Sequence, residues 1–152
     1  MKEFSQSCYG VDVLKVELPV NPAFIGNATA SVETETAYSR QQAIENLRNA
    51  VRAATKPFIF LSAGVSDEVF RNTLEMATEA GVQYAGVLCG RATWQGGIPV
   101  YAQQGVIALH DWLAEHGARN IQMINEVLAR GATPWWNAYG GKNNIEVIEP
   151  LD

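Results

Sequence analysis

Three runs of β-branched and aromatic residues alternate with segments of helical periodicity, and this order constrains the fold more than any other feature. The runs cover residues 11–18, 58–62 and 82–88, and each has the length of a strand. The last two lack polar alternation, which is typical of strands that are covered on both faces in a parallel sheet. The sequence therefore predicts an α/β fold whose strands are joined by right-handed crossovers.

Serine residues predict where the two helices between these runs begin. Ser39 is followed by Gln42 at the spacing of a capping box, which predicts a helix over about residues 40–54. Ser66 precedes two acidic residues, which the positive end of a helix dipole favours, and predicts a second helix that stops at Gly81. These caps complete the order strand, helix, strand, helix, strand.

Apolar periodicity predicts two further helices after the third run. The first extends over residues 106–116 and stops at Gly117, and the second is capped by Asn120 and stops before Gly131. The helical spacing of apolar residues then ends.

The length of 152 residues favours one domain. We expect this domain over residues 1–136, an irregular tail over residues 137–152, and a mobile loop over residues 19–38. Three strand-helix units fit either an open doubly wound sheet or a piece of a (β/α)₈ barrel, which usually takes about 250 residues.

Charge and cysteine content exclude several classes of function. The net charge of −5 and the pI near 5.0 offer no general attraction to nucleic acid or to an anionic membrane. Cys8 and Cys89 are too far apart to suggest a disulfide framework or a zinc site, and His110 and His116 lack a spaced metal partner. The chain has no secretory or spanning apolar run, so we expect a cytoplasmic protein.

Lys15 is the strongest candidate for chemistry because it lies inside the first predicted strand. Removal from water disfavours the ammonium form, so a lysine at such a position can attack a carbonyl carbon. Glu17 lies two residues further along the strand, on the same face, and could assist proton transfer. The alternative is that Lys15 only reaches solvent or pairs with Glu17 structurally.

Two glycine-containing turns are candidates for phosphate binding. Ser62, Ala63 and Gly64 follow the second strand, where small residues expose backbone N–H groups. Gly90 and Arg91 follow the third strand, where a guanidinium can donate two hydrogen bonds to phosphate oxygens. Neighbouring parallel strands would bring the two turns together. The alternative is that the glycines only permit tight turns and that Arg91 pairs with a surface carboxylate.

These same segments resemble a known family. Residues 11–17 (VDVLKVE), 61–66 (LSAGVS) and 86–94 (GVLCGRATW) look like the last three strand-and-loop segments of bacterial class I tagatose-1,6-bisphosphate aldolases. Their order and spacing agree with that family, and the similarity covers most of residues 4–136. Residues 27–36 and the tail from residue 137 depart from it.

The resemblance implies the C-terminal portion of a (β/α)₈ barrel, about three βα units, in which Lys15 forms a Schiff base with a ketose. Ser62, Gly64, Gly90 and Arg91 would hold a substrate phosphate. Cleavage of a ketohexose bisphosphate such as tagatose 1,6-bisphosphate would give dihydroxyacetone phosphate and glyceraldehyde 3-phosphate, and the family needs no metal or other cofactor. Its proton-transferring glutamate belongs to earlier strands that this chain lacks, so we expect impaired activity from the chain alone.

Two hypotheses follow for the function. The first is an aldehyde-lyase that binds a phosphorylated ketose, and the second is a non-catalytic phosphosugar-binding or interaction half-barrel derived from such an enzyme. Under either hypothesis the open edge and interior of a partial barrel favour a homo-oligomer or a complementing half-barrel as partner.

Overall fold

The computed structural model describes residues 1–21, 24–26 and 37–146. Most of the loop that we expect to be mobile, and the end of the expected irregular tail, lie outside the described residues. The described part of the tail contains two short helical turns, η5 (Trp135–Tyr139) and η6 (Lys142–Asn144). Two others, η1 (Glu3–Ser5) and η2 (Ser7–Tyr9), precede the first strand.

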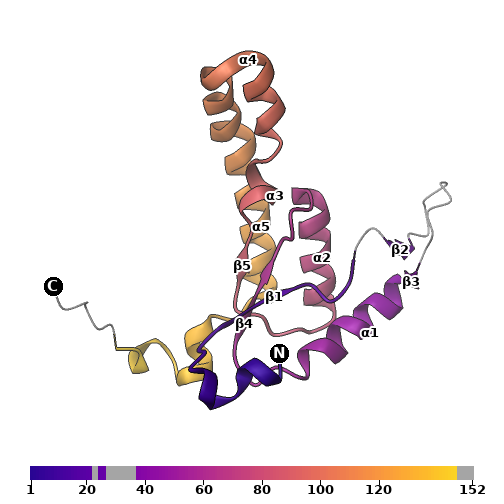
Figure 1. The fold of residues 1–152 in the computed structure, drawn as a ribbon, viewed down its shortest axis with the longest axis vertical. Coiled ribbons are helices and arrows are strands. Elements are labelled where there is room, and N and C mark those ends of the chain that lie inside the picture. Colours follow the sequence, from indigo (N-terminus) through magenta and orange to yellow (C-terminus); the bar gives the residue numbers. More distant parts are fainter. Residues whose placement is uncertain (22–23, 27–36, 147–152) are drawn as a thin grey trace.

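A three-stranded parallel sheet forms the centre of the molecule, with the order β1 (Leu14–Glu17), β4 (Phe58–Leu61), β5 (Val87–Leu88) (Figure 1). This arrangement confirms the predicted α/β class and the parallel pairing. A second parallel pair joins β2 (Ile25–Gly26) to β3 (Tyr38–Ser39).

The strands are shorter than the apolar runs that predict them. The run over residues 82–88 supplies only two strand residues, because Gly86 has a φ of 149° that interrupts the extended backbone. Tyr84 forms an isolated bridge with Ala132 instead of continuing the sheet. Apolar patterning therefore marks the buried segment correctly but overestimates its regular part.

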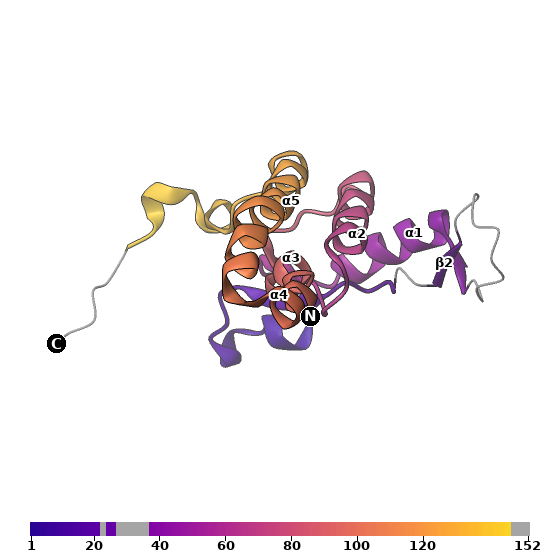
Figure 2. The ribbon, with the colours of Figure 1, turned by 90° about the horizontal axis from the view of Figure 1, so that it is seen from above.

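Helices α1 (Arg40–Val51) and α2 (Asp67–Glu79) begin where the serine caps predict. Ser39 accepts a hydrogen bond from the Gln42 N–H, and the Gln42 side chain accepts one from the Ser39 N–H, so the capping box is complete. Ser66 caps α2 through the Val69 N–H. Seen from above, α1, α2 and α5 lie in a row along one side of the molecule (Figure 2).

After α3 (Gly90–Trp94), helix α4 (Gly97–Trp112) forms a hairpin that projects away from the sheet (Figure 1). Gly105 breaks the helix with φ 82° and ψ −171°, a backbone conformation that favours glycine. The arms pack closely, because a Cβ at Gly97 would lie 2.7 Å from Leu109 Cδ1 and 2.9 Å from Trp112 Cε3. The predicted helix over residues 106–116 is thus only the second arm.

The predicted helix boundary at Gly117 is wrong. Gly117 is buried with helical angles, and the turn Leu113–Gly117 has π-helical pairing that leads directly into α5 (Ala118–Gly131). Asn120 consequently lies inside α5 and does not cap it. Its side-chain amide donates a hydrogen bond of 3.0 Å to the Thr93 carbonyl, which ties α5 to α3.

The main core lies between the sheet and the row of helices. Leu14 pairs in register with Phe58, and both are buried. Phe60 is fully buried, and its ring centroid lies 5.3 Å from those of Phe58 and Tyr84. The helices contribute further buried side chains to this cluster, namely Ile44, Leu47, Phe70, Leu74, Ile124 and Val127. No helix in the described part of the chain is long and apolar enough to cross a membrane.

Candidate functional site

The opposite face of the sheet is open. Residues paired in register on parallel strands point to the same face, so Lys15 shares this face with Ile59, and Glu17 shares it with Leu61 and Leu88. Lys15 and Glu17 are exposed, and Leu88 keeps 52% of its surface exposed. The two predicted catalytic residues therefore lie on the face that no helix among the described residues covers.

The expectation that Lys15 is removed from water is wrong for the described chain. The strand is apolar in sequence, but its buried residues point to the helices and Lys15 points to the open face. None of the ion pairs or side-chain hydrogen bonds in the described part joins Lys15 to Glu17. The ion pair between Lys15 and Glu17, which the sequence left open as an alternative, is thus absent from the described residues.

The turn after β4 has an unusual backbone conformation. Ala63 has a φ of 52° and Gly64 a φ of 84°, so two successive residues adopt positive φ. The turn is fixed by hydrogen bonds from the Val65 N–H to the Ser62 carbonyl at 3.1 Å and from the Ser62 N–H to the Leu88 carbonyl at 3.2 Å. Among the described residues the N–H groups of Ala63 and Gly64 take no part in backbone hydrogen bonds, so both are available to a ligand.

Arg91 lies directly against this turn. A Cβ at Gly64 would be 3.0 Å from the Arg91 Cζ, so the guanidinium occupies the space that any larger residue would need. None of the ion pairs within the described ranges involves Arg91. The two predicted phosphate turns therefore meet, and the alternative in which Arg91 neutralises a surface carboxylate is not seen there.

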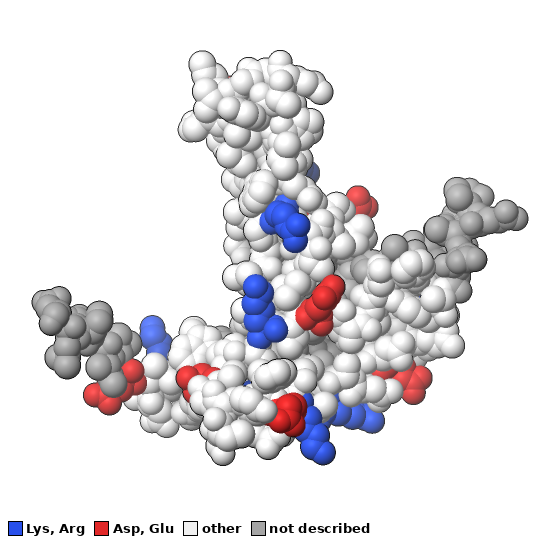
Figure 3. All heavy atoms as spheres, in the orientation of Figure 1, with Lys and Arg blue, Asp and Glu red and all other residues white. Residues whose placement is uncertain are grey.

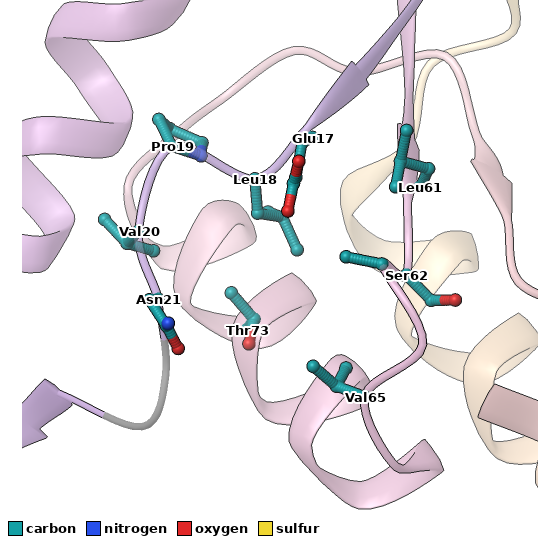
Figure 4. Close-up of a pocket in the computed structure, with 10 residues that line it drawn as sticks. Glu17, Leu18, Pro19, Val20, Asn21, Leu61, Ser62, Val65 and Thr73 are labelled. Atoms are coloured by element: carbon teal, nitrogen blue, oxygen red, sulfur yellow. The ribbon is translucent and has the colours of Figure 1, made fainter.

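Of the five predicted phosphate-binding residues, Ser62 alone is buried, at 7% exposure. In Figure 4 its hydroxyl points away from Glu17, toward the covered side of the sheet. Gly90 is exposed at the start of α3, and its carbonyl accepts a hydrogen bond of 2.7 Å from Thr93. The accessible donors at this edge therefore come from Ala63, Gly64 and Arg91.

The sequence did not single out Gln95, which holds the two turns together. Its side-chain amide donates a hydrogen bond of 3.0 Å to the Val65 carbonyl, across thirty positions of sequence. A polar residue four positions after Arg91, at the C-cap of the short helix α3, is the sequence signal for this role. Gln95 therefore supports the turn.

A hollow of about 580 Å³ lies beside the turn, between the ends of β1 and β4 (Figure 4). Glu17 lines one side, and Leu61, Ser62 and Ala63 line the other. Lys15 is not among the residues that line the hollow. The carboxyl ends of the strands thus bring together the Glu17 carboxylate, the free N–H groups of the turn after β4 and the Arg91 guanidinium. The Lys15 amine lies on the same face of the sheet as Glu17.

Asp67 and Cys89 lie behind this edge, on the covered side. Burial raises the pKa of the Asp67 carboxyl, although the Arg71 guanidinium at 2.9 Å opposes the shift. The other carboxylate oxygen, Oδ1, is buried without a hydrogen-bond partner among the described residues. Burial, followed by the charge of Asp67, also raises the pKa of the Cys89 thiol. Both effects disfavour a thiolate, which agrees with Cys89 as a packing residue.

Among the described residues there is no group of three or more His, Cys, Asp or Glu side chains that could hold a metal ion. His116 stacks on Trp112 at a ring distance of 5.4 Å, and His110 is exposed beside Asp111. Both histidines therefore belong to the projecting hairpin and not to the sheet edge.

Comparison with known proteins shows the family to which the chain belongs. The sequence model of the DeoC/LacD family aldolases matches residues 1–96, which contain all three strands and both turns. The chain belongs to this aldolase family. Its family membership also confirms the resemblance to tagatose-bisphosphate aldolases that the three sequence segments indicate.

Several curated aldolases are similar to nearly the whole chain. A tagatose 1,6-diphosphate aldolase of Listeria monocytogenes is 45% identical over 149 residues, which is 98% of this chain and 43% of the relative. Tagatose 1,6-diphosphate aldolase 2 of Enterococcus faecalis is 50% identical over 136 residues, and the Staphylococcus epidermidis enzyme is 46% identical over 137. The chain spans less than half the length of these relatives.

Proposed function

We propose that this chain carries the Schiff-base lysine and the phosphate-binding turns of a class I aldolase. The substrate class is a ketohexose bisphosphate such as tagatose 1,6-bisphosphate, and the products are dihydroxyacetone phosphate and glyceraldehyde 3-phosphate. The observation that carries the proposal is the contact between Arg91 and the Gly64 turn. This contact lies at the carboxyl edge of the sheet whose open face holds Lys15.

The first step is condensation of the Lys15 amine with the ketose carbonyl. The amine attacks the carbonyl carbon, and loss of water gives a protonated imine whose nitrogen can accept an electron pair. The bond between the third and fourth carbons then breaks. Its electrons move toward the imine nitrogen to form an enamine, while the hydroxyl proton on the fourth carbon passes to a base and the aldehyde product leaves. Protonation of the enamine carbon and hydrolysis by water release the ketone product and the free amine.

Glu17 is the acid–base group that this chain can supply on the same face. It lies two residues from Lys15 and lines the hollow at the strand ends. The glutamate that the family resemblance assigns to proton transfer belongs to strands outside this chain. We therefore propose an assisting role for Glu17 and impaired turnover by the chain alone.

The substrate phosphate binds at the carboxyl ends of β4 and β5, to one side of the strand β1 that carries Lys15. The N–H groups of Ala63 and Gly64 and the guanidinium of Arg91 converge there, with Ser62 and Gly90 shaping the two turns. β1 and β5 are two strand spacings apart, roughly 10 Å. A phosphorylated ketone held at the turns can thus reach across the sheet toward the strand of Lys15.

The exposed position of Lys15 requires a cover. We propose that the sheet is part of a (β/α)₈ barrel, with residues 1–136 as its C-terminal portion and residues 137–152 as a tail. The remaining strands would come from a complementing half-barrel or from a second chain of an oligomer. Covering the open face would remove the Lys15 amine from water, which the reaction needs.

Borohydride trapping tests the nucleophile directly. The chain is incubated with dihydroxyacetone phosphate and sodium borohydride, and peptide mass spectrometry locates the reduced adduct. We expect the adduct on Lys15 and its loss in Lys15→Arg. The chain has three other lysines, and Lys56→Arg is the matched control because that side chain lies near the Tyr139 ring and away from the edge. An adduct that persists in Lys15→Arg would contradict the mechanism.

Phosphate binding is tested separately by titrating inorganic phosphate and dihydroxyacetone phosphate into the chain by calorimetry. Arg91→Ala should weaken binding of both ligands by roughly tenfold or more, because a hydrogen bond to a charged group is lost. Binding that is lost in Arg91→Ala, together with no adduct on Lys15, would favour the non-catalytic phosphosugar-binding half-barrel instead.

A further inference from the structure

The segment that follows α5 runs along the amino ends of the strands, and the proposed reaction does not use it. The Thr133 N–H donates a hydrogen bond of 2.8 Å to the Tyr84 carbonyl, ahead of β5. Further along, the Tyr139 hydroxyl donates a hydrogen bond of 2.6 Å to the Asp12 carbonyl, ahead of β1. We call residues 132–139 the strap. In Figure 1 the strap lies below the sheet, at the end opposite α3, whereas the phosphate turns lie at the carboxyl ends.

Tyr139 also reaches the strand between these two. The Lys56 Nζ lies 5.8 Å from the centre of the Tyr139 ring, and Lys56 is followed by Pro57 and then by β4. Trp135 packs against the same ring, with the two ring centroids 6.3 Å apart. One side chain therefore contacts the segments that lead into β1 and β4, and the strap as a whole contacts the segments that lead into all three strands.

Apolar patterning alone does not fix the position of β1 along its neighbour. Leu14, Val16 and Leu18 all pack in or against the main core. A shift of one residue would expose these side chains and bury Lys15, so burial disfavours it. A shift of two residues would put one apolar side chain in the place of the next and would move Lys15 by about 6–7 Å along the strand. Contacts outside the apolar pattern must therefore select the observed position.

The hydrogen bonds at the start of β1 supply such contacts. The Leu14 N–H donates a hydrogen bond of 2.9 Å to the Pro57 carbonyl, and Tyr139 holds the Asp12 carbonyl. A shift of β1 in either direction breaks the bond to Tyr139. A shift toward the carboxyl edge would also bring Gly10 to the hydroxyl, and the φ of 60° at Gly10 does not suit an extended strand.

We propose that Tyr139 is a positioning residue for Lys15. By holding the start of β1, the strap fixes the distance along the sheet between the Lys15 amine and the phosphate turns after β4 and β5. The inference rests on the proposed function, which assigns the amine and the turns to one substrate. A ketone phosphate has a fixed length, so it reaches the amine from the turns only when this distance is correct. Tyr139 lies at the amino edge and acts only through β1.

Borohydride trapping with two ketones measures this distance. Dihydroxyacetone phosphate uses both the amine and the phosphate turns, whereas dihydroxyacetone uses the amine alone. The variant Tyr139→Phe removes only the hydroxyl and keeps the ring. We expect it to lower the ratio of the two trapping rates by roughly three- to tenfold, because one hydrogen bond is lost. The rate with dihydroxyacetone should not change, whereas a general loss of structure would lower both rates.

Tyr9→Phe is the matched control, because the Tyr9 hydroxyl donates a hydrogen bond of 2.7 Å to Glu3 within the N-terminal turns and not at the strap. We expect the wild-type ratio in this variant. Calorimetry with inorganic phosphate should give one affinity for the wild-type chain and both variants, because the turns after β4 and β5 are unchanged. A wild-type ratio in Tyr139→Phe, an equal fall in Tyr9→Phe, or weaker phosphate binding in Tyr139→Phe would overturn the proposal.

Hydrogen exchange of single amides, followed by nuclear magnetic resonance, tests the strap without any ligand. The Leu14 N–H bonds to Pro57 on the side of β4 that faces β1, whereas the Ala85 N–H donates a hydrogen bond of 2.7 Å to the Phe58 carbonyl on the other side. Tyr139→Phe should speed exchange at Leu14 by roughly threefold or more and leave exchange at Ala85 unchanged. Equal exchange at Leu14 in the wild-type chain and in Tyr139→Phe would contradict the strap.

These measurements separate failure of the strap from failure of the proposed function. A wild-type chain that forms no adduct on Lys15, or that traps both ketones at one rate, would refute the proposed function and with it the role of Tyr139 in spacing the nucleophile. A wild-type chain that prefers the phosphorylated ketone, with the same preference in Tyr139→Phe, would refute the strap alone. Faster exchange at Leu14 with an unchanged ratio would leave Tyr139 with a structural role only, and would also overturn the proposal.

Discussion

The two faces of the same three strands differ in what they hold. The covered face carries Leu14, Phe58 and Phe60, which are buried under the helices and form the main core. The open face carries Lys15 and Glu17, which are exposed. Alternate residues of one strand therefore contribute to the core on one side and are exposed to solvent on the other.

This difference teaches where substitutions should matter. A parallel sheet is normally covered on both faces, and under the proposed function the exposed face of this sheet is the surface for a substrate and further strands. Changes on the covered face should alter the free energy of unfolding. Changes on the open face should alter binding and imine formation and leave the free energy of unfolding almost unchanged.

The largest effect should come from Phe60→Ala. The ring is fully buried and touches two other aromatic rings, so its removal leaves a cavity and should cost about 3–5 kcal/mol of unfolding free energy. Urea unfolding followed by tryptophan fluorescence measures this loss. A cost below about 1 kcal/mol would mean that the covered face is not the core.

Gly64→Ala should have an intermediate effect that involves both faces. A residue with a Cβ at φ 84° is strained by roughly 1–2 kcal/mol, and the Cβ would displace the Arg91 guanidinium. We expect lower stability and weaker binding of inorganic phosphate, measured by urea unfolding and calorimetry.

Ala63→Gly is the matched control for that change, because it relaxes a positive φ of 52° in the same turn without touching Arg91. It should retain phosphate binding. If Gly64→Ala bound phosphate as tightly as the wild-type chain, the turn would not be the phosphate site.

A smaller effect should appear in the pH dependence of stability. Burial raises the folded-state pKa of Asp67 above its ordinary value of 3.8, so the folded chain binds this proton more tightly than the unfolded chain. The contribution to stability is therefore greatest below the unfolded value and is lost as the pH rises through the folded pKa.

In the variant Asp67→Asn the side chain cannot titrate, so the decline in stability with rising pH that Asp67 causes should be absent. The unfolding free energy of the wild-type chain relative to the variant should fall as the pH rises from below 3.8 through the raised folded-state pKa of Asp67. Urea unfolding at several pH values measures the difference. A relative stability that rises over this range would show that the Arg71 ion pair outweighs burial.

The smallest effects should come from the open face. Lys15→Met and Leu88→Ala should each change the unfolding free energy by less than about 0.5 kcal/mol, because both side chains are exposed in the described chain. Lys15→Met should nevertheless abolish borohydride trapping. A loss of stability comparable to that of Phe60→Ala would show that another part of the molecule covers this face.

Local signals in the sequence predicted local structure well. The spacing of Ser39 and Gln42 located the start of α1, and Ser66 located the start of α2, because a cap depends on residues within one helical turn. The meeting of the two glycine-containing turns after β4 and β5 was also predictable, since neighbouring parallel strands place their ends at one edge.

Features that depend on distant residues were not predictable in this way. The exposure of Lys15 depends on which face the helices cover, and the sequence pattern of the strand is apolar on both sides of the lysine. The first arm of α4 was missed because Gly96 and Gly97 interrupt the apolar periodicity. Their packing against Trp112, across fifteen or more positions, is what makes that arm possible.

The uninterrupted connection through Gly117 gives the hairpin a mechanical role. The second arm, the π turn and α5 form a single rod of roughly 40 Å, from Val106 to Gly131. At its far end there is no slack, because a Cβ at Gly131 would lie 2.0 Å from the Thr78 hydroxyl of α2. A sideways force on the tip is therefore transmitted along this rod to α2, which packs against the sheet.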